Sequence, residues 1–97
     1  MATLRPLSDA ELVNAVLLRV VRLEGNETSS QVSVDVEYAC QEVLGVDVRE
    51  RQSDVSVAVY GSPQNPNCRQ RADISSHVFT LSGPLGSRQL HERRTGD

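Results

Sequence analysis

Four side chains are candidate ligands for a structural zinc ion: the thiols of Cys40 and Cys68 and the imidazoles of His77 and His91. Structural zinc sites draw their ligands from closely spaced pairs, such as C-x-x-C or H-x-x-x-H. The chain contains no such pair, because its shortest gap, from Cys68 to His77, is nine residues. The sequence therefore predicts no metal site and no bound cofactor.

A serine beside a histidine is the second arrangement that could do chemistry. Imidazole activates a hydroxyl nucleophile in many hydrolases, and Ser75 and Ser76 precede His77 directly. Ser76 and His77 are neighbours on an expected strand, so their side chains point to opposite faces and cannot pair directly. The chain also lacks a G-x-S-x-G sequence. We therefore predict that the protein is not an enzyme.

The two cysteines allow two states. In a reducing compartment Cys40 and Cys68 would both be thiols. If they were oxidised to a disulfide, closing the loop between them would stabilise the fold by roughly 3 kcal/mol. The sequence leaves this choice open.

Charge limits the class of partner. The chain has 13 acidic and 10 basic residues and a net charge of −3. Nucleic-acid affinity comes mainly from neutralising phosphates, so this balance argues against general nucleic-acid binding. Arginine clusters can still form local basic patches. Such pairs occur at Arg49 and Arg51, Arg69 and Arg71, and Arg93 and Arg94.

A helix over residues 9–24 is the element that the sequence favours most. Ser8 and Glu11 have the spacing of a capping box, and Gly25 is a natural C-terminal stop. Apolar residues then recur at helical spacing. They are Leu12, Val13, Val16, Leu17, Val20 and Val21.

Residues 28–45 fit two patterns. Val32, Val34 and Val36 alternate with polar residues, as on a half-buried strand. A second capping box at Thr28 and Gln31, together with Gly45, favours instead a helix over 29–44. The alternative is a strand at 31–36 followed by a short helix at 37–44.

After residue 45 the apolar residues recur at every second position, as on a β-strand. Residues 46–49 and 55–60 predict a β-hairpin, residues 61–73 a long loop, and residues 76–82 a third strand. The predicted fold class is α+β, with an N-terminal helical hairpin packed on a small antiparallel sheet of two or three strands. The expected organisation is an N-terminal arm at 1–7, a single α+β domain at 8–83 and a mobile tail at 84–97.

The sequence shows no apolar segment of membrane-spanning length, and its first residues do not resemble a signal peptide. We therefore expect a protein that is not secreted and does not enter a membrane. A location in the cytoplasm or within a larger particle, as for a viral, phage or organellar accessory subunit, is the corresponding expectation.

The first expected helix is apolar over most of its circumference, which is typical of a helix buried on several sides. This favours a small protein–protein interaction or assembly subunit with a protein partner or a homo-oligomer. The expected docking residues are Leu18, Val21 and Leu23, with Arg69 and Arg71 as secondary contacts. The alternative is a nucleic-acid-binding protein of winged-helix-like outline that uses the arginine-bearing loop.

Overall fold

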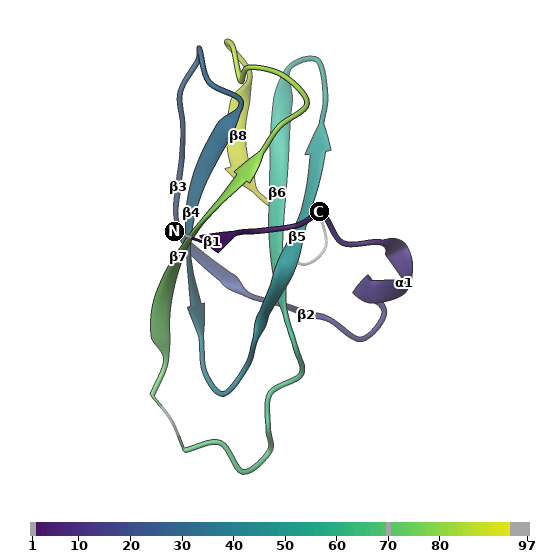
Figure 1. The fold of residues 1–97 in the computed structure, drawn as a ribbon, viewed down its shortest axis with the longest axis vertical. Coiled ribbons are helices and arrows are strands. Elements are labelled where there is room, and N and C mark those ends of the chain that lie inside the picture. Colours follow the sequence, from purple (N-terminus) through teal and green to yellow (C-terminus); the bar gives the residue numbers. More distant parts are fainter. Residues whose placement is uncertain (1, 70, 94–97) are drawn as a thin grey trace.

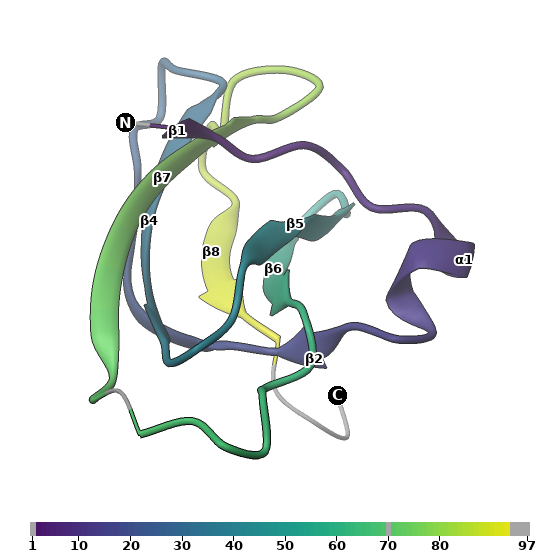
Figure 2. The same ribbon diagram turned by 60° about the horizontal axis from the view of Figure 1, so that its bottom comes forward.

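Two β-sheets pack face to face in this computed structural model, which describes residues 2–69 and 71–93 (Figures 1 and 2). Sheet A has the strand order β1-β7-β4-β3, and sheet B has the order β2-β6-β5, with β8 also paired to β6. The elements are β1 (Ala2–Thr3), α1 (Asp9–Leu12), β2 (Val16–Leu17), β3 (Arg19–Gly25), β4 (Gln31–Tyr38), β5 (Val43–Glu50), β6 (Asp54–Gly61), β7 (Asp73–Thr80) and β8 (Gln89–Glu92).

The α+β prediction is wrong, because the described residues are mostly strand and form no helical hairpin. The capping box of Ser8 and Glu11 is present, but it begins a helix of only 4 residues, α1. Most of the remaining residues of the predicted helix over 9–24 form strands β2 and β3 instead. Strand β4 and the start of β5 take the place of the helix over 29–44, and no helix forms at 37–44.

The alternation of apolar and polar residues, and not the helical spacing, matches the structure of β4. Val32, Val34 and Val36 all point into the sandwich, and none of them is more than 1% exposed. A helix would place Val34 on the side opposite Val32 and Val36, whereas a strand buries all three on one face. Their β-branched side chains also fit a pleated sheet better than a helix.

The apolar residues of strand β3 have helix-like spacing because the strand contains a β-bulge. Its register against β4 shifts between Val20 and Arg22, which leaves Val21 as the extra residue. Val20 and Leu23 therefore both pack against the core although they are three residues apart. This i, i+3 spacing is also the spacing of a helical face.

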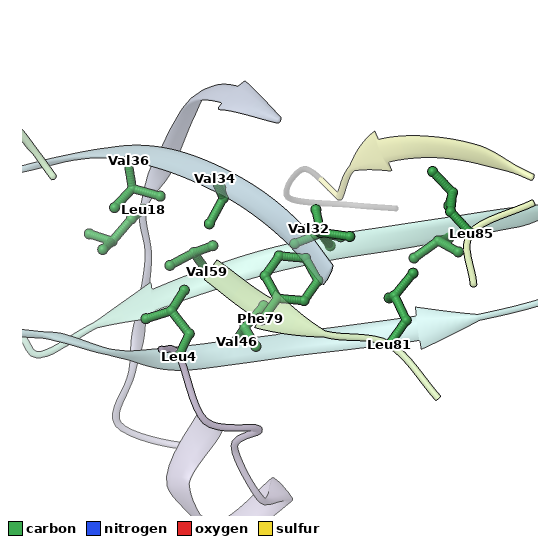
Figure 3. Close-up of a cluster of buried hydrophobic side chains, with 12 residues drawn as sticks. Leu4, Leu18, Val32, Val34, Val36, Val46, Val59, Phe79, Leu81 and Leu85 are labelled. Carbon is green, nitrogen blue, oxygen red and sulfur yellow. The ribbon is translucent and has the colours of Figure 1, made fainter. Parts of the chain in front are cut away.

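The predicted hairpin over 46–49 and 55–60 is present as β5 and β6, which pair antiparallel. Strand β6 lies at the centre of sheet B, with β5 on one side and β8 and β2 on the other. Its inward residues Val55, Val57 and Val59 are fully buried. They meet the valines of β4 and Phe79 of β7 in a core that Figure 3 shows.

The N-terminal segment, residues 2–7, crosses from one sheet to the other (Figure 2). It first runs parallel to β7, where the Leu4 N–H donates to the Val78 carbonyl at 2.7 Å. It then reaches β5, where the Leu7 N–H donates to the Val46 carbonyl and the Val46 N–H donates to the Arg5 carbonyl, both at 3.0 Å. The segment thus covers only the Val46 end of the outer edge of β5.

A disulfide joins Cys40 to Cys68, so the oxidised alternative is the one found. It ties the connection between β4 and β5 to the connection between β6 and β7, and both connections cross between the sheets at one end of the sandwich. Gln41 reinforces this end by donating from its amide to the Ser62 carbonyl at 2.8 Å.

Part of the segment expected to be a mobile tail, 84–97, is built into the sandwich. Leu85 is buried in the core, and Gln89–Glu92 form β8, which runs parallel to β6. Residues 94–97 lie outside the described residues.

Candidate functional site

A groove of about 550 Å³ opens between the sheets where β5 faces the N-terminal segment and β7. Its apolar lining includes Leu4, Leu7, Val46, Val48 and Phe79. Three of these residues, Leu4, Val46 and Phe79, belong to the core, so the groove leads from solvent to the interior. A concave, mostly apolar site with a few polar groups is typical of a binding site.

The edge of β5 adds hydrogen-bonding groups to this groove. The N–H and C=O of Val46 point away from β6, toward Arg5 and Leu7. Residues two apart on a strand direct these groups to the same side, so those of Val48 also face the groove. In the described parts of the chain, no strand or bridge pairs with this side of β5 after Val46.

An ion pair fixes one rim of the groove. Arg5 binds the Glu11 carboxylate through both ends of its guanidinium, and the Ser8 N–H and hydroxyl donate to the same carboxylate at 3.2 and 3.1 Å. The hydrogen bonds from Arg5, with those from Ser8, lower the pKa of Glu11 from 4.5 to about 2. This rim is therefore held by a carboxylate that stays ionised far below neutral pH.

Glu50 lies at the end of the groove that is farther along β5 from Val46. Its carboxylate accepts from the Ser82 N–H and hydroxyl, both at 3.0 Å, and from Arg88 at 3.2 Å. Burial opposes ionisation of Glu50, but these hydrogen bonds outweigh it and lower its pKa. The groove is thus bounded along β5 by residue 46 at one end and residue 50 at the other.

A serine–histidine pair lies elsewhere between the sheets. The Ser75 hydroxyl is 2.7 Å from Nε2 of His77. Burial lowers the pKa of His77, so its imidazole is neutral at pH 7. Its Nδ1 is buried and has no hydrogen-bond partner within the described residues. Without a carboxylate on Nδ1, the pair lacks the third member that orients a catalytic histidine.

Of the two serines that precede His77, Ser75 and not Ser76 pairs with it. Ser76 is exposed, on the face of β7 opposite His77. Ser75 is two residues from His77 and therefore shares its face. This spacing could have identified the pair from the sequence.

The structure separates the three apolar residues that were predicted to dock a partner. Leu18 is 6% exposed and lies in the core at the crossing from β2 to β3. Leu23 is partly buried against the same core. Val21, at the bulge, is 45% exposed. The helix face that was to present them together does not form.

Two of the arginine pairs belong to connections at opposite ends of the sandwich, the β6–β7 connection and the β5–β6 turn (Figure 1). Arg69 and Arg71 are exposed in the connection next to the disulfide, whereas Arg49 and Arg51 lie at the turn between β5 and β6. The winged-helix-like outline is absent, since α1 is too short to serve as a recognition helix.

Arg93 has a structural contact that the sequence did not suggest. Its side chain is 9% exposed and binds Asp47 across the outer face of sheet B. Arg49 is more distant from the same carboxylate, at 3.9 Å, and is 55% exposed. Asp47 is thus neutralised mainly by Arg93, which leaves Arg49 directed to solvent. Arg94 lies outside the described residues.

Neither a metal centre nor a membrane-spanning helix is found in the described ranges. These residues contain no group of three or more His, Cys, Asp or Glu side chains that could hold a metal ion. They also contain no helix with the length and apolarity needed to cross a membrane.

The groove residues were not identified from the sequence. The sequence pattern indicates Val46, Val48 and Phe79 only as residues of expected strands, and Leu4 only as part of an arm. What these residues share is that they line one groove beside the free edge of β5. That edge is free because of the order of the strands in sheet B. Comparison with protein-family models, with curated proteins and with solved structures found no match.

Proposed function

We propose that the protein is a non-enzymatic binding domain whose groove holds an extended segment of a protein partner. The observation that carries this proposal is the groove itself, in which core side chains lie beside main-chain groups of β5 that have no described partner. Covering apolar surface is favourable by about 25 cal/mol per Å². An extended segment could cover this surface and also bond to the strand edge.

The chain's own N-terminal segment supports an extended occupant. Arg5 and Leu7 already bond to the first part of the same edge in an extended conformation. A partner segment would continue this arrangement past Val46. The partner is thus expected to use main-chain hydrogen bonds together with one or more apolar side chains.

Selection from a library of random linear peptides displayed on phage tests this function. Val48→Trp fills the groove, and Val21→Trp places the same residue at an exposed position on the other sheet. Selected peptides should bind wild type and Val21→Trp equally, but bind Val48→Trp at least about tenfold more weakly, a difference of about 1.4 kcal/mol. Thermal unfolding checks that both variants are folded.

Three results would overturn the proposal. The first is a set of peptides that bind Val48→Trp as well as wild type, and the second is the recovery of no binding peptide. The third is a wild-type dimer in analytical ultracentrifugation that Val48→Trp converts to a monomer, since the groove would then hold a second copy of the chain.

We also propose that the domain works in an oxidising compartment. The Cys40–Cys68 disulfide supports this, because such bonds persist outside the reducing cytoplasm. It weighs against the cytoplasmic location that the sequence favoured. Acid-quenched thiol labelling of protein from its native cell should detect no free thiol, whereas labelling of both cysteines would contradict this location.

A further inference from the structure

We infer that the partner segment binds as an added β-strand on residues 47–50 of β5, and that it alternates apolar with acidic residues. This inference rests on the proposed function and specifies the partner of the same groove. It combines three observations: the main-chain groups on the free side of β5, the apolar interior of the groove, and Arg49 and Arg51 on and just after the edge strand.

The main chain sets the mode of binding. Val46 bonds through its N–H and C=O to Arg5 and Leu7. Val48 is two residues further along the strand, so its N–H and C=O point to the same side of β5. An exposed strand edge of this kind accepts an extended peptide through main-chain hydrogen bonds. The four residues from 47 to 50 span roughly 13 Å at the rise of a β-strand. This length fits a short added strand.

The groove sets the inward side chains. Side chains of an added strand alternate between the two faces of sheet B. Those on the inner face would lie opposite Val48 and reach toward Leu4 and Phe79. These walls are apolar, so an inward polar side chain without a partner would be unfavourable. The inward positions are therefore apolar.

Charge sets the outward side chains. Arg49 lies on the outer face of β5, and side chains directly opposite each other on neighbouring strands are about 5 Å apart. Among the described residues, the ion-pair partner of Arg49 is Asp47, at 3.9 Å, and Arg93 already binds this carboxylate more closely. Arg51 follows at the end of the edge and has no ion-pair partner in the described chain.

The two acidic residues of this edge, Asp47 and Glu50, are already paired with arginines. Asp47 binds Arg93, and Glu50 binds Arg88. Because Arg49 shares Asp47 with Arg93, and Arg51 has no ion-pair partner among the described residues, the edge carries an excess of positive charge. An acidic residue at an outward position of the partner strand complements it.

Synthetic peptides of about eight residues, a typical strand length, test the inference by NMR titration of the disulfide-bonded domain. One peptide alternates valine with glutamate, and its counterpart alternates valine with lysine. The glutamate peptide should bind at least about tenfold more tightly than the lysine peptide. Equal affinity, or tighter binding of the lysine peptide, would overturn the acidic preference.

Two pairs of variants separate the parts of the inference. Val48→Pro removes an N–H that faces away from β6, so the hairpin can remain intact, whereas Val48→Ile keeps that N–H. Arg49→Glu reverses the charge at the edge, and Arg69→Glu makes the same change at the other end of the sandwich. Binding of the glutamate peptide should be lost in Val48→Pro and Arg49→Glu and retained in the two controls.

The outcomes distinguish this inference from the proposed function. Library-selected peptides that Val48→Trp excludes but that bind Val48→Pro normally would overturn strand addition and leave the groove as the binding site. The absence of any peptide that Val48→Trp excludes would overturn both. Unchanged binding of the glutamate peptide to Arg49→Glu would overturn the acidic preference alone.

Discussion

Glu11 is the residue that joins the groove rim to α1. Its carboxylate binds Arg5 on the N-terminal segment and also completes the capping box with Ser8. One side chain therefore fixes both the start of the helix and the position of the segment that borders the groove.

The lowered pKa of Glu11 gives a prediction about acid stability. Its pKa falls from 4.5 to about 2 in the folded protein, so the unfolded chain binds the proton more readily. The stabilisation from Glu11 is complete above pH 4.5 and should be lost as the pH falls toward 2. Glu11→Gln should remove this part of the pH dependence in urea unfolding measured across that range.

Side-chain NMR provides the direct check. A Glu11 carboxyl that titrates near 4.5 in the folded protein would contradict the ion pair.

Among the elements, the N-terminal segment depends on one glycine. A Cβ on Gly45 would lie 2.5 Å from the Arg5 carbonyl oxygen and 2.8 Å from a Leu7 methyl carbon. No flexible side chain can absorb the clash with the carbonyl, so the segment must move. Gly45 therefore permits the close approach of residues 5–7 to β5.

Gly45→Ala should destabilise the fold by about 1–3 kcal/mol, as overpacking does. Gly83→Ala is the matched control, because a Cβ there meets nothing within 4 Å. Chemical denaturation of the two variants measures the difference. Equal stability of the two variants would show that residues 5–7 are not packed on β5.

The elements that the sequence could predict are those with a strictly local pattern. Val55, Val57 and Val59 occupy every second position without interruption, and the predicted hairpin of β5 and β6 is confirmed. The capping box of Ser8 and Glu11 was also found, but a cap determines only where a helix can begin. Its length depends on competing contacts, and here residues 16–25 pair with β6 and β4 instead.

Strand β3 could not be predicted because its pattern is ambiguous. The bulge at Val21 gives Val20 and Leu23 the spacing of a helical face while both remain on one face of a strand. Only the pairing with β4 resolves this ambiguity, and that pairing is a long-range interaction. β-propensity is correspondingly weak evidence without knowledge of the neighbouring strands.

At the scale of the whole molecule, the disulfide supplements a core that is built mainly from valine and leucine. The core cluster contains one aromatic residue, Phe79. The 28-residue separation of Cys40 and Cys68 implies a stabilisation of about 3 to 4 kcal/mol in the chain-entropy account. For a domain of this size, that is a large part of the total stability.

The Cys40→Ser, Cys68→Ser double variant should therefore lose about 3 to 4 kcal/mol of unfolding free energy. Urea unfolding of the variant and of wild type, each with and without reductant, measures the loss. Reductant should destabilise wild type to the level of the variant and leave the variant unchanged. Equal stability of the two proteins without reductant would contradict the bond.

The groove is also a property of the whole molecule. It exists because β5 lies at the edge of sheet B and the N-terminal segment covers only part of that edge. Neither the order of the strands in sheet B nor the partial coverage of the β5 edge can be inferred from the residues around Val46 and Val48. The sequence could therefore supply the strand but not its free edge.

Amide hydrogen exchange at Val48, measured by NMR on the free domain, tests the free edge most directly. The Val48 N–H should exchange rapidly, while the Val46 N–H, bonded to Arg5, and the Val57 N–H, in the core strand, should be protected. Adding the valine–glutamate peptide should then protect Val48. A Val48 amide that is already protected in the free domain would contradict the account, because the proposed binding edge would be occupied.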